Sequence, residues 1–532
     1  MNHGISPYYE AHLTTLRQMC PHLEGDPPLC AHVPLVLRGV EDDLVSLDDL
    51  RRFVEALLAT VEPSRALNHL LHYLEILDAP SRIWMAWKQD AKSIPQTLTL
   101  FAGSAYLCHV LCRRPDALFW LLNGALSMPS LEPAQLTRDL EQLLQGKEEE
   151  AEVAACLRAF THHHLLRIGA RDLNGLADVE TTTADLSTLA DCVVQAGLTM
   201  CQRWLEAVYG PPLYTDAQGA QHPCHFCVIG MGKLGGFELN FSSDIDLMYV
   251  YTSYQGETRG VWRDGGWRKS ISNHEFYVAL ARRLTNLIGG KGPEGQAFRV
   301  DLRLRPNGTQ GQLALSLLSY EAYYTRMGQT WEKMALLKAR PIAGAKELGD
   351  AFMALIHPFV YQRHLDPEGL ERIREIKRQI DVQIADKAQA LTNVKLGLGG
   401  IREIEFFIQI LQLIFGGRHP VLQERHSLKA LMRLQQTGLI TDAVAVTLRD
   451  TYCYLRRVEH FLQMEQGSQT HTLPQSETPR QRLARLCGFD HWELFYQDYL
   501  ARTDAVHTIF QTAFEPSSYP QAAWSADHET TC

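Results

Sequence analysis

The stretch GMGKLGGFELNFSSDIDLMYV, from Gly230 to Val250, decides the fold of the central part of this chain. Its second half has the β-branched and aromatic content of a strand, and strand side chains alternate between two faces. Asp244 and Asp246 therefore share one face, while Ile245 and Leu247 point into the core. Two adjacent carboxylates both stay ionised only if a cation lies between them, and Mg²⁺ or Mn²⁺ with oxygen ligands suits that position.

The first half of the stretch predicts a seat for a phosphate group. HFCVIGMG is expected to form a short buried strand, after which Lys233, Gly235 and Gly236 turn the chain and FELNF begins a brief helix. Glycines let the backbone approach a phosphate, and the N–H groups at a helix start favour an anion. Lys233 adds a positive charge, and Ser242 and Ser243 add hydroxyl groups. The alternative is a tight glycine turn between two core strands.

A third carboxylate is predicted on the alternating segment FRVDLRLRP, Phe298–Pro306. Its apolar residues take one face, and Arg299, Asp301, Arg303 and Arg305 take the other. If this segment lies beside the first strand, Asp301 joins the two earlier aspartates, and three carboxylates can hold two metal ions for in-line displacement at phosphorus. The alternative is a solvated edge strand with an ordinary face of aspartate and arginine.

These motifs resemble the nucleotidyltransferase superfamily of the polymerase-beta type. Longer strings resemble the glutamine synthetase adenylyltransferase family, whose members add AMP to a tyrosine of glutamine synthetase and remove it. The strings that carry the resemblance are GMGKLGG with ELNFSSDIDL, FRVDLRLRP, GQTWEKMALLKARPIAG, VKLGLGGIREIEFFIQ and YLRRVEHFLQMEQGSQTHTLP. The resemblance runs from about Leu165 to about Pro474.

The family enzyme carries two copies of this module, and this sequence has one. Its wording is similar to the N-terminal copy, which in the family removes AMP from adenylyl-tyrosine with inorganic phosphate and releases ADP. The resemblance thus implies phosphorolysis by a natural half-enzyme or by a fragment of a two-module protein. Adenylyl transfer from ATP to the synthetase tyrosine and a non-catalytic regulatory binding module are the alternatives. Glutamine synthetase is the implied partner, with a PII-class signalling protein as a second.

The resemblance also implies a set of roles. Two divalent ions, Mg²⁺ or Mn²⁺, are held by Asp244, Asp246 and Asp301; phosphate or nucleotide is held by Lys233, Gly235, Gly236, Ser242, Ser243, Arg303, Arg305 and Lys338. Lys338 and Arg340 are expected at the end of a helix closed by Pro341, where cations also occur for dipole reasons alone. Glu403 and Glu405 follow a glycine pair; they either face the site or belong to an ordinary amphipathic helix.

Bulk properties favour an intracellular enzyme. The chain has 532 residues, 45% hydrophobic and 21% charged, which are globular values. A net charge of −10 argues against nucleic-acid binding, which usually needs a basic surface. The 12 cysteines are expected to be reduced thiols, with Cys224 and Cys227 as a redox or zinc pair the lesser alternative. No apolar run of membrane-spanning length and no signal peptide is present, so a cytoplasmic location is expected.

The predicted fold is mostly α, with a central α/β nucleotidyltransferase domain of the polymerase-beta type flanked by helical domains. The expected boundaries are 1–214 for an N-terminal helical domain, 215–345 for the catalytic domain, 346–515 for a helical bundle and 516–532 for a disordered tail. The segment 252–273 is expected to be a mobile loop beside the site. His162, His163 and His164 are expected to form a solvated run rather than a metal site, since adjacent helix residues point in different directions.

Overall fold

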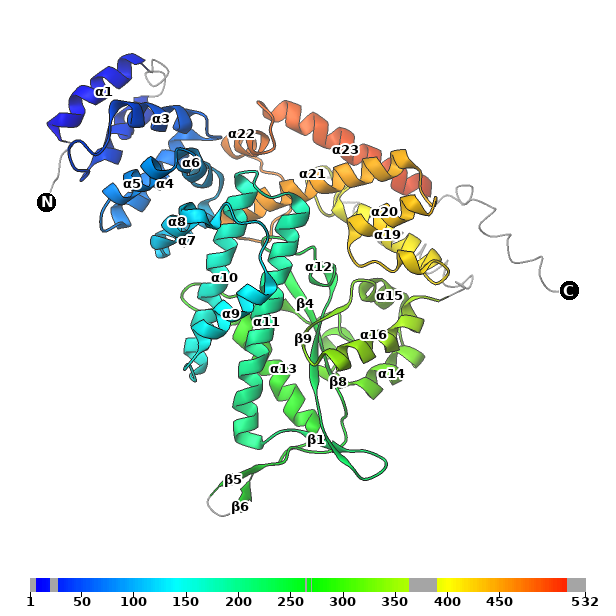
Figure 1. Cartoon of the computed structure of the whole chain (residues 1–532). Helices are drawn as coiled ribbons and strands as arrows, with labels where there is room; N and C mark the ends of the chain where they lie inside the picture. Colours follow the sequence, from blue (N-terminus) through cyan, green and yellow to red (C-terminus); the bar gives the residue numbers. More distant parts are fainter. Residues whose placement is uncertain (1–5, 20–26, 264–265, 269, 363–389, 514–532) are drawn as a thin grey trace. The chain divides into compact units, whose positions relative to one another are not determined.

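The computed structural model of the chain describes residues 6–19, 27–263, 266–268, 270–362 and 390–513 (Figure 1). Its contacts divide the chain into two compact units that interleave along the sequence. The first unit contains residues 1–130, 162–185 and 457–495, and the second contains residues 131–161, 186–456 and 496–532. The sequence LERIREIKRQIDVQIADKAQAL, residues 370–391, also predicts a helix, and most of it lies outside the described residues. The expected tail lies entirely outside them.

The first unit is helical throughout its described part. Its own helices are α1 (Pro7–Met19), α2 (Pro27–His32), η2 (Val33–Leu37), α3 (Leu47–Leu58), α4 (Pro63–Ile76), α5 (Ser81–Gln89), α6 (Ser93–Gly103), α7 (Ala105–Arg113), α8 (Asp116–Trp120), η3 (Leu121–Ala125) and α22 (Glu477–Leu486). Local sequence sets some of these ends: Ser46 caps α3 in a reciprocal capping box with Asp49. The helical N-terminal region expected from sequence is confirmed.

The second unit combines helices with the central sheet. Its helices are α9 (Pro133–Leu144), α12 (Gly232–Gly235), α13 (Asn273–Gly289), η4 (Gly308–Gln310), α14 (Leu317–Arg326), α15 (Thr330–Leu336), α16 (Lys346–Val360), α19 (Ile401–Phe415), η5 (Pro420–Leu422) and α20 (Ser427–Gln436). Four long helices contribute residues to both units: α10 (Glu150–Leu173), α11 (Val179–Tyr209), α21 (Asp442–Gln466) and α23 (Trp492–Ala513).

The sheet of the second unit has five strands in the order β7-β4-β3-β9, with β8 also paired to β4. These strands are β3 (Phe226–Gly230), β4 (Asp244–Tyr251), β7 (Arg299–Asp301), β8 (Ala314–Ser316) and β9 (Arg340–Gly344). β3 is antiparallel to β4 and β9, whereas β7 and β8 run parallel to β4. β3 is buried along its whole length, so the expected core strand is confirmed. A mostly α chain with a central mixed domain is confirmed as the fold class.

The parallel pairing of β4 with β7 requires a crossover, which α13 supplies. Ser272 and Glu275 form a capping box that fixes the start of this helix at Asn273. One face of α13 covers the sheet, where Tyr277 stacks on Phe226 and Tyr251 at centroid distances of 5.5 and 4.9 Å. The β4 tyrosines, Tyr249 and Tyr251, are therefore core residues.

Two hairpins were not predicted, and one expectation about local structure is wrong. The segment 252–273, expected to be a mobile loop, contains a hairpin of β5 (Val261–Arg263) with β6 (Gly266–Arg268). A smaller hairpin joins β1 (Leu213–Thr215) to β2 (Gln221–Pro223). Pro341 lies inside β9 rather than closing a helix; α15 ends at Leu336. A proline is tolerated there because β9 has only one partner, β3.

The three adjacent histidines of α10 are also not a solvated run. His164 is buried, and the ring of His163 lies 3.8 Å from that of Trp120. Burial lowers the pKa of His163 to about 4 and that of His164 to about 3, so both are neutral core side chains.

Among the described residues, no helix has the length and apolar character needed to cross a membrane.

Candidate active site

The register of β4 against β7 brings the predicted carboxylates together. Asp246 pairs with Asp301 across the two parallel strands, and Asp244 pairs with Arg299. Ile245 between the two aspartates is fully buried, which fixes the face that they share. The predicted convergence of Asp301 with the Asp-x-Asp strand is therefore confirmed at the level of the backbone.

Two arginines neutralise the outer carboxylates of this group. Arg299 Nε donates to Asp244 Oδ1 at 2.6 Å, and Arg303 Nε donates to Asp301 Oδ2 at 2.8 Å. Although burial acts in the opposite direction, hydrogen bonds from Arg303 hold the pKa of Asp301 below its usual value. The side chain of Arg303 is 72% exposed, so it is tethered to Asp301 at one end and reaches solvent at the other.

Asp246, between these two, has a different environment. Among the described residues it forms no ion pair, and burial together with the charges of Asp301 and Asp244 raises its pKa to about 7. Gly232, with φ of 53°, lies against it: a Cβ on Gly232 would be 2.4 Å from Asp246 Oδ2. Any side chain at this position would displace the carboxylate, so the glycine leaves the room that Asp246 needs.

This donor set fits a divalent cation of the Mg²⁺ or Mn²⁺ type. Hard cations prefer carboxylate oxygens, and the strand register brings three carboxylates together here. Burial and the charges of Asp301 and Asp244 raise the pKa of Asp246, although Lys395 and Arg303 act in the opposite direction. In the described part of the chain no group of three or more His, Cys, Asp or Glu side chains is already arranged to hold a metal. In this structure Arg299 pairs with Asp244 Oδ1, and Arg303 donates to both carboxylate oxygens of Asp301.

The glycine turn differs from the prediction in its details. The short helix covers Gly232–Gly235 and ends before Phe237, which has φ of 57°, so FELNF does not begin a helix. The N–H groups of Gly235 and Gly236, expected to donate to a phosphate, donate to the carbonyls of Met231 and Gly232. A Cβ on Gly235 would be 2.0 Å from Lys338 O, so this glycine permits close backbone packing.

The expected phosphate-binding cations fall into two groups. Lys233 Nζ lies 2.8 Å from Glu405 Oε1, and Lys338 is buried in an ion pair with Glu238, so both have carboxylate partners within the protein. Arg303 differs from these two lysines because its side chain is largely exposed to solvent. The hydroxyl of Ser242 is buried near Arg299, at 3.4 Å, and Ser243 is only partly buried.

Arg305 corrects the predicted strand. β7 ends at Asp301 rather than alternating on to residue 305. The reason is an Asx-type turn in which Asp301 Oδ1 accepts the backbone N–H of Arg303 at 2.8 Å. Arg305 is buried, and it donates to the carbonyls of Leu302, Thr309 and Gly311 at 2.7, 3.2 and 3.1 Å. Its guanidinium thus holds this turn instead of facing a phosphate.

Sequence reasoning missed three residues of the site. Arg299 was placed on the polar face but given no role, and Gly232 was read as the end of a strand. Arg456, 216 residues from its partner Asn240, gave no local signal. The motif GMGK, residues 230–233, was the available signal for Gly232.

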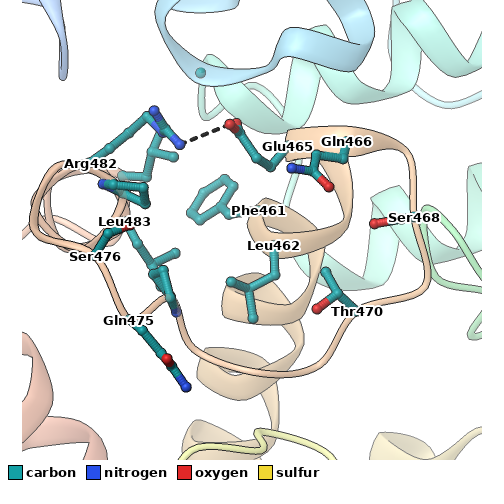
Figure 2. Close-up of a pocket in the computed structure, with 14 residues that line it drawn as sticks. Phe461, Leu462, Glu465, Gln466, Ser468, Thr470, Gln475, Ser476, Arg482 and Leu483 are labelled. Atoms are coloured by element: carbon teal, nitrogen blue, oxygen red, sulfur yellow. Dashed lines mark hydrogen bonds and ion pairs between the residues drawn. The ribbon is translucent and has the colours of Figure 1, made fainter.

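A separate pocket of about 460 Å³ lies within the first unit (Figure 2). Phe461, Leu462 and Leu483 supply apolar walls, and Arg482 Nη2 donates to Glu465 Oε1 at 2.8 Å. Glu465 is the one acidic residue in its lining and is already paired. The pocket therefore does not offer the group of carboxylates that defines the candidate active site.

Comparisons with known proteins find two matching family models and a set of similar curated proteins. Residues 94–355 match the family model described as glutamate-ammonia ligase adenylyltransferase, and residues 374–514 match one described as GlnD PII-uridylyltransferase. Proteins named bifunctional glutamine synthetase adenylyltransferase/adenylyl-removing enzyme are 38% identical in Thioalkalivibrio sulfidiphilus, 38% in Pseudomonas putida and 36% in Xanthomonas campestris. These alignments cover 79%, 82% and 88% of this chain and 42%, 44% and 46% of the relatives.

The mixed sheet with aspartates on adjacent strands, together with these matches, places the chain in the nucleotidyltransferase class. Within that class, residues 94–355 match the glutamate-ammonia ligase adenylyltransferase family, and the relatives named above align with most of the chain. The chain spans less than half the length of the curated relatives that it matches.

Proposed function

We propose that this chain removes AMP from the adenylyl-tyrosine of glutamine synthetase by phosphorolysis, with inorganic phosphate as the attacking group and ADP as the product. The observation that carries the proposal is the register of Asp246 with Asp301 beside Asp244, in a chain whose relatives are named for both adenylylation and its removal. The choice of removal rests on the similarity of the GMGK and NFSSDID wording to the adenylyl-removing copy of the family.

The three aspartates would hold Mg²⁺ or Mn²⁺, which supplies charge neutralisation at the phosphorus of AMP. Binding would displace Arg303 from Asp301, and its exposed side chain would then be free to hold an oxygen of the incoming phosphate. Arg299 is less exposed and also contacts Ser242, so it would stay to orient Asp244. Lys233 and Lys338, paired with glutamates, would shape the positive surroundings of the turn instead of contacting phosphate.

Adenylyl transfer from ATP to the synthetase tyrosine is the second candidate. The same carboxylates would serve both directions, because the transferred group and the metal requirement are the same. A non-catalytic binding module is the third, and the presence of all three aspartates at facing positions of adjacent strands argues against it. Regulation by a PII-class protein is proposed from the description of the family that matches residues 374–514.

The experiment is a pair of reactions with purified proteins. Adenylylated glutamine synthetase with phosphate and Mg²⁺ should yield ADP, and unmodified synthetase with ATP should yield little AMP on tyrosine. The reverse result would assign adenylyl transfer to this chain. Binding of synthetase without either product would support the regulatory module and contradict catalysis.

A further inference from the structure

The segment between the glycine turn and β4 is held by residues far from it in sequence. Glu238 and Asn240 are 1% and 2% exposed, and Asn240 stands four residues before Asp244. Ser427 N donates to Glu238 Oε1 at 2.6 Å from the start of α20, and Lys338 pairs with the same carboxylate. We call residues 238–240 the lead-in segment. The position of Asp244 therefore depends on a segment that these buried contacts hold in place.

Arg456 of α21 makes the most extensive contact with this segment. Its Nε donates to Asn240 Oδ1 at 2.9 Å, and its Nη2 donates to the carbonyl of Glu238 at 2.6 Å. Its Nη1 donates to the hydroxyl of Tyr452 at 2.6 Å. Arg456 is 1% exposed. Its buried guanidinium therefore donates hydrogen bonds both to the backbone and to a side chain of the lead-in segment.

The same network reaches the other side of the candidate site. The hydroxyl of Tyr452 donates to Glu405 Oε1 at 3.0 Å, and that oxygen accepts from Lys233 Nζ at 2.8 Å. Although burial opposes it, the charges of Lys233 and Lys338 hold the pKa of Glu405 well below its usual value. Lys233 belongs to α12, next to the glycine that abuts Asp246. Arg456 is thus linked to both the lead-in segment and the glycine turn.

We propose that Arg456 is a positioning residue for the metal-binding carboxylates, acting through the segment 238–240 and through Tyr452 and Glu405. This inference deepens the proposed function and rests on the metal site that it assigns. The planar fork of arginine is required, because the three hydrogen bonds leave in different directions and a lysine ammonium cannot span them. The helices after the sheet domain therefore set the geometry of a site whose ligands lie on the sheet.

The test uses Arg456→Lys in the full chain, with Arg449→Lys as the matched control. Arg449 lies on the same helix, but its side chain is 57% exposed. Mn²⁺ affinity is measured by titration with electron paramagnetic resonance, alongside kcat for ADP formation and the thermal midpoint. Loss of orienting contacts to metal ligands typically costs ~10–100-fold, so Arg456→Lys should bind Mn²⁺ at least about tenfold more weakly. Arg449→Lys should match the wild type.

Tyr452→Phe keeps the inference testable if Arg456→Lys does not fold. It removes one hydroxyl that joins Arg456 to Glu405, and it should weaken Mn²⁺ binding in the same direction by a smaller factor. A lower thermal midpoint with unchanged Mn²⁺ affinity and kcat in both variants would overturn the inference, since it would mark a purely structural role.

The proposed function can fail separately. If the wild type binds Mn²⁺ and forms no ADP, the proposed reaction is wrong, while the altered Mn²⁺ affinity of Arg456→Lys still supports the positioning role. If the wild type binds no Mn²⁺, both are overturned.

Discussion

Two clusters of acidic residues in the second unit differ in how their charge is balanced. At the edge of β4 and β7, three aspartates share two arginine partners, and the pKa of Asp246 is raised to about 7 by burial and by its two acidic neighbours. Beneath the glycine turn, Glu238 and Glu405 share Lys338, Lys233 and Arg456. There, despite burial, the cations hold the pKa of both glutamates below the usual value.

The difference separates a structural cluster from a functional one. In the glutamate network each carboxylate has cationic partners within the protein. Removing one member therefore leaves a buried charge without its partner. The aspartate group has no such complete set of cationic partners, and we propose that a divalent metal supplies the missing positive charge. The same residue types therefore stabilise the fold in one place and keep a site ready for a ligand in the other.

The largest expected effect comes from removing an aspartate of the incomplete cluster. Asp246→Asn or Asp301→Asn should lower ADP formation by more than ~100-fold, because even indirect partners of a metal ligand are worth 10–100-fold. A coupled assay of ADP from adenylylated glutamine synthetase measures it. Asp350→Asn is the matched control and should keep full activity, because the side chain of Asp350 on α16 is 59% exposed. Full activity in Asp246→Asn would refute the assignment of the site.

The complete cluster should respond in stability. Glu405→Gln leaves Lys233 without its carboxylate partner and should lower the free energy of unfolding by about 3 kcal/mol. Denaturant titration followed by tryptophan fluorescence measures this, with exposed Glu347→Gln as the control. An unchanged midpoint for Glu405→Gln would mean that the two clusters do not differ as described.

Metal binding should depend on pH through Asp246. Below pH 7 its carboxyl is protonated, so a proton competes with the cation, and Mn²⁺ affinity should fall by up to about tenfold per pH unit. Above pH 7 the affinity should level off. Isothermal titration calorimetry in buffers of different ionisation enthalpy should detect the released proton near pH 7. A pH-independent affinity between pH 6 and 8 would contradict the raised pKa.

A smaller effect concerns stability without metal. Because the folded-state pKa of Asp246 lies above the unfolded value, its protonated form stabilises the fold at low pH, and this contribution is lost as pH rises to about 7. Asp246→Asn should therefore raise the stability of the metal-free protein at pH 8 by about 1–2 kcal/mol. The gain should shrink toward pH 5. Thermal melts with a chelator at both pH values provide the comparison, and a destabilised variant at pH 8 would count against it.

Much of this arrangement follows from short-range patterns. The alternation of apolar and acidic residues in SDIDL and FRVDL predicted that Asp244, Asp246 and Asp301 share a surface, and the strand register agrees. Strand faces are readable from sequence because the side-chain period is two. The helix Asn273–Gly289 was also predictable, since its capping box and amphipathic pattern are both local.

The remainder depends on contacts that no local pattern encodes. In the sequence pattern Arg305 is equivalent to Arg303. In the structure the strand ends at Asp301, whose side chain accepts a hydrogen bond from the backbone N–H of Arg303 and forms a turn. Lys233 looked like a phosphate ligand, but its partner Glu405 lies 172 residues away. The grouping of residues 162–185 and 457–495 with the first unit likewise requires long-range packing, whereas the predicted domain boundaries at 214, 345 and 515 followed the chain in order.

The central claim is that Asp244, Asp246 and Asp301 bind a divalent cation at the point where AMP is released. A Mn²⁺ titration of the wild type, Asp246→Asn and Asp301→Asn by electron paramagnetic resonance tests it most directly. The account predicts saturable binding by the wild type that each substitution abolishes or weakens by more than ~100-fold. Equal Mn²⁺ binding by all three proteins would contradict it.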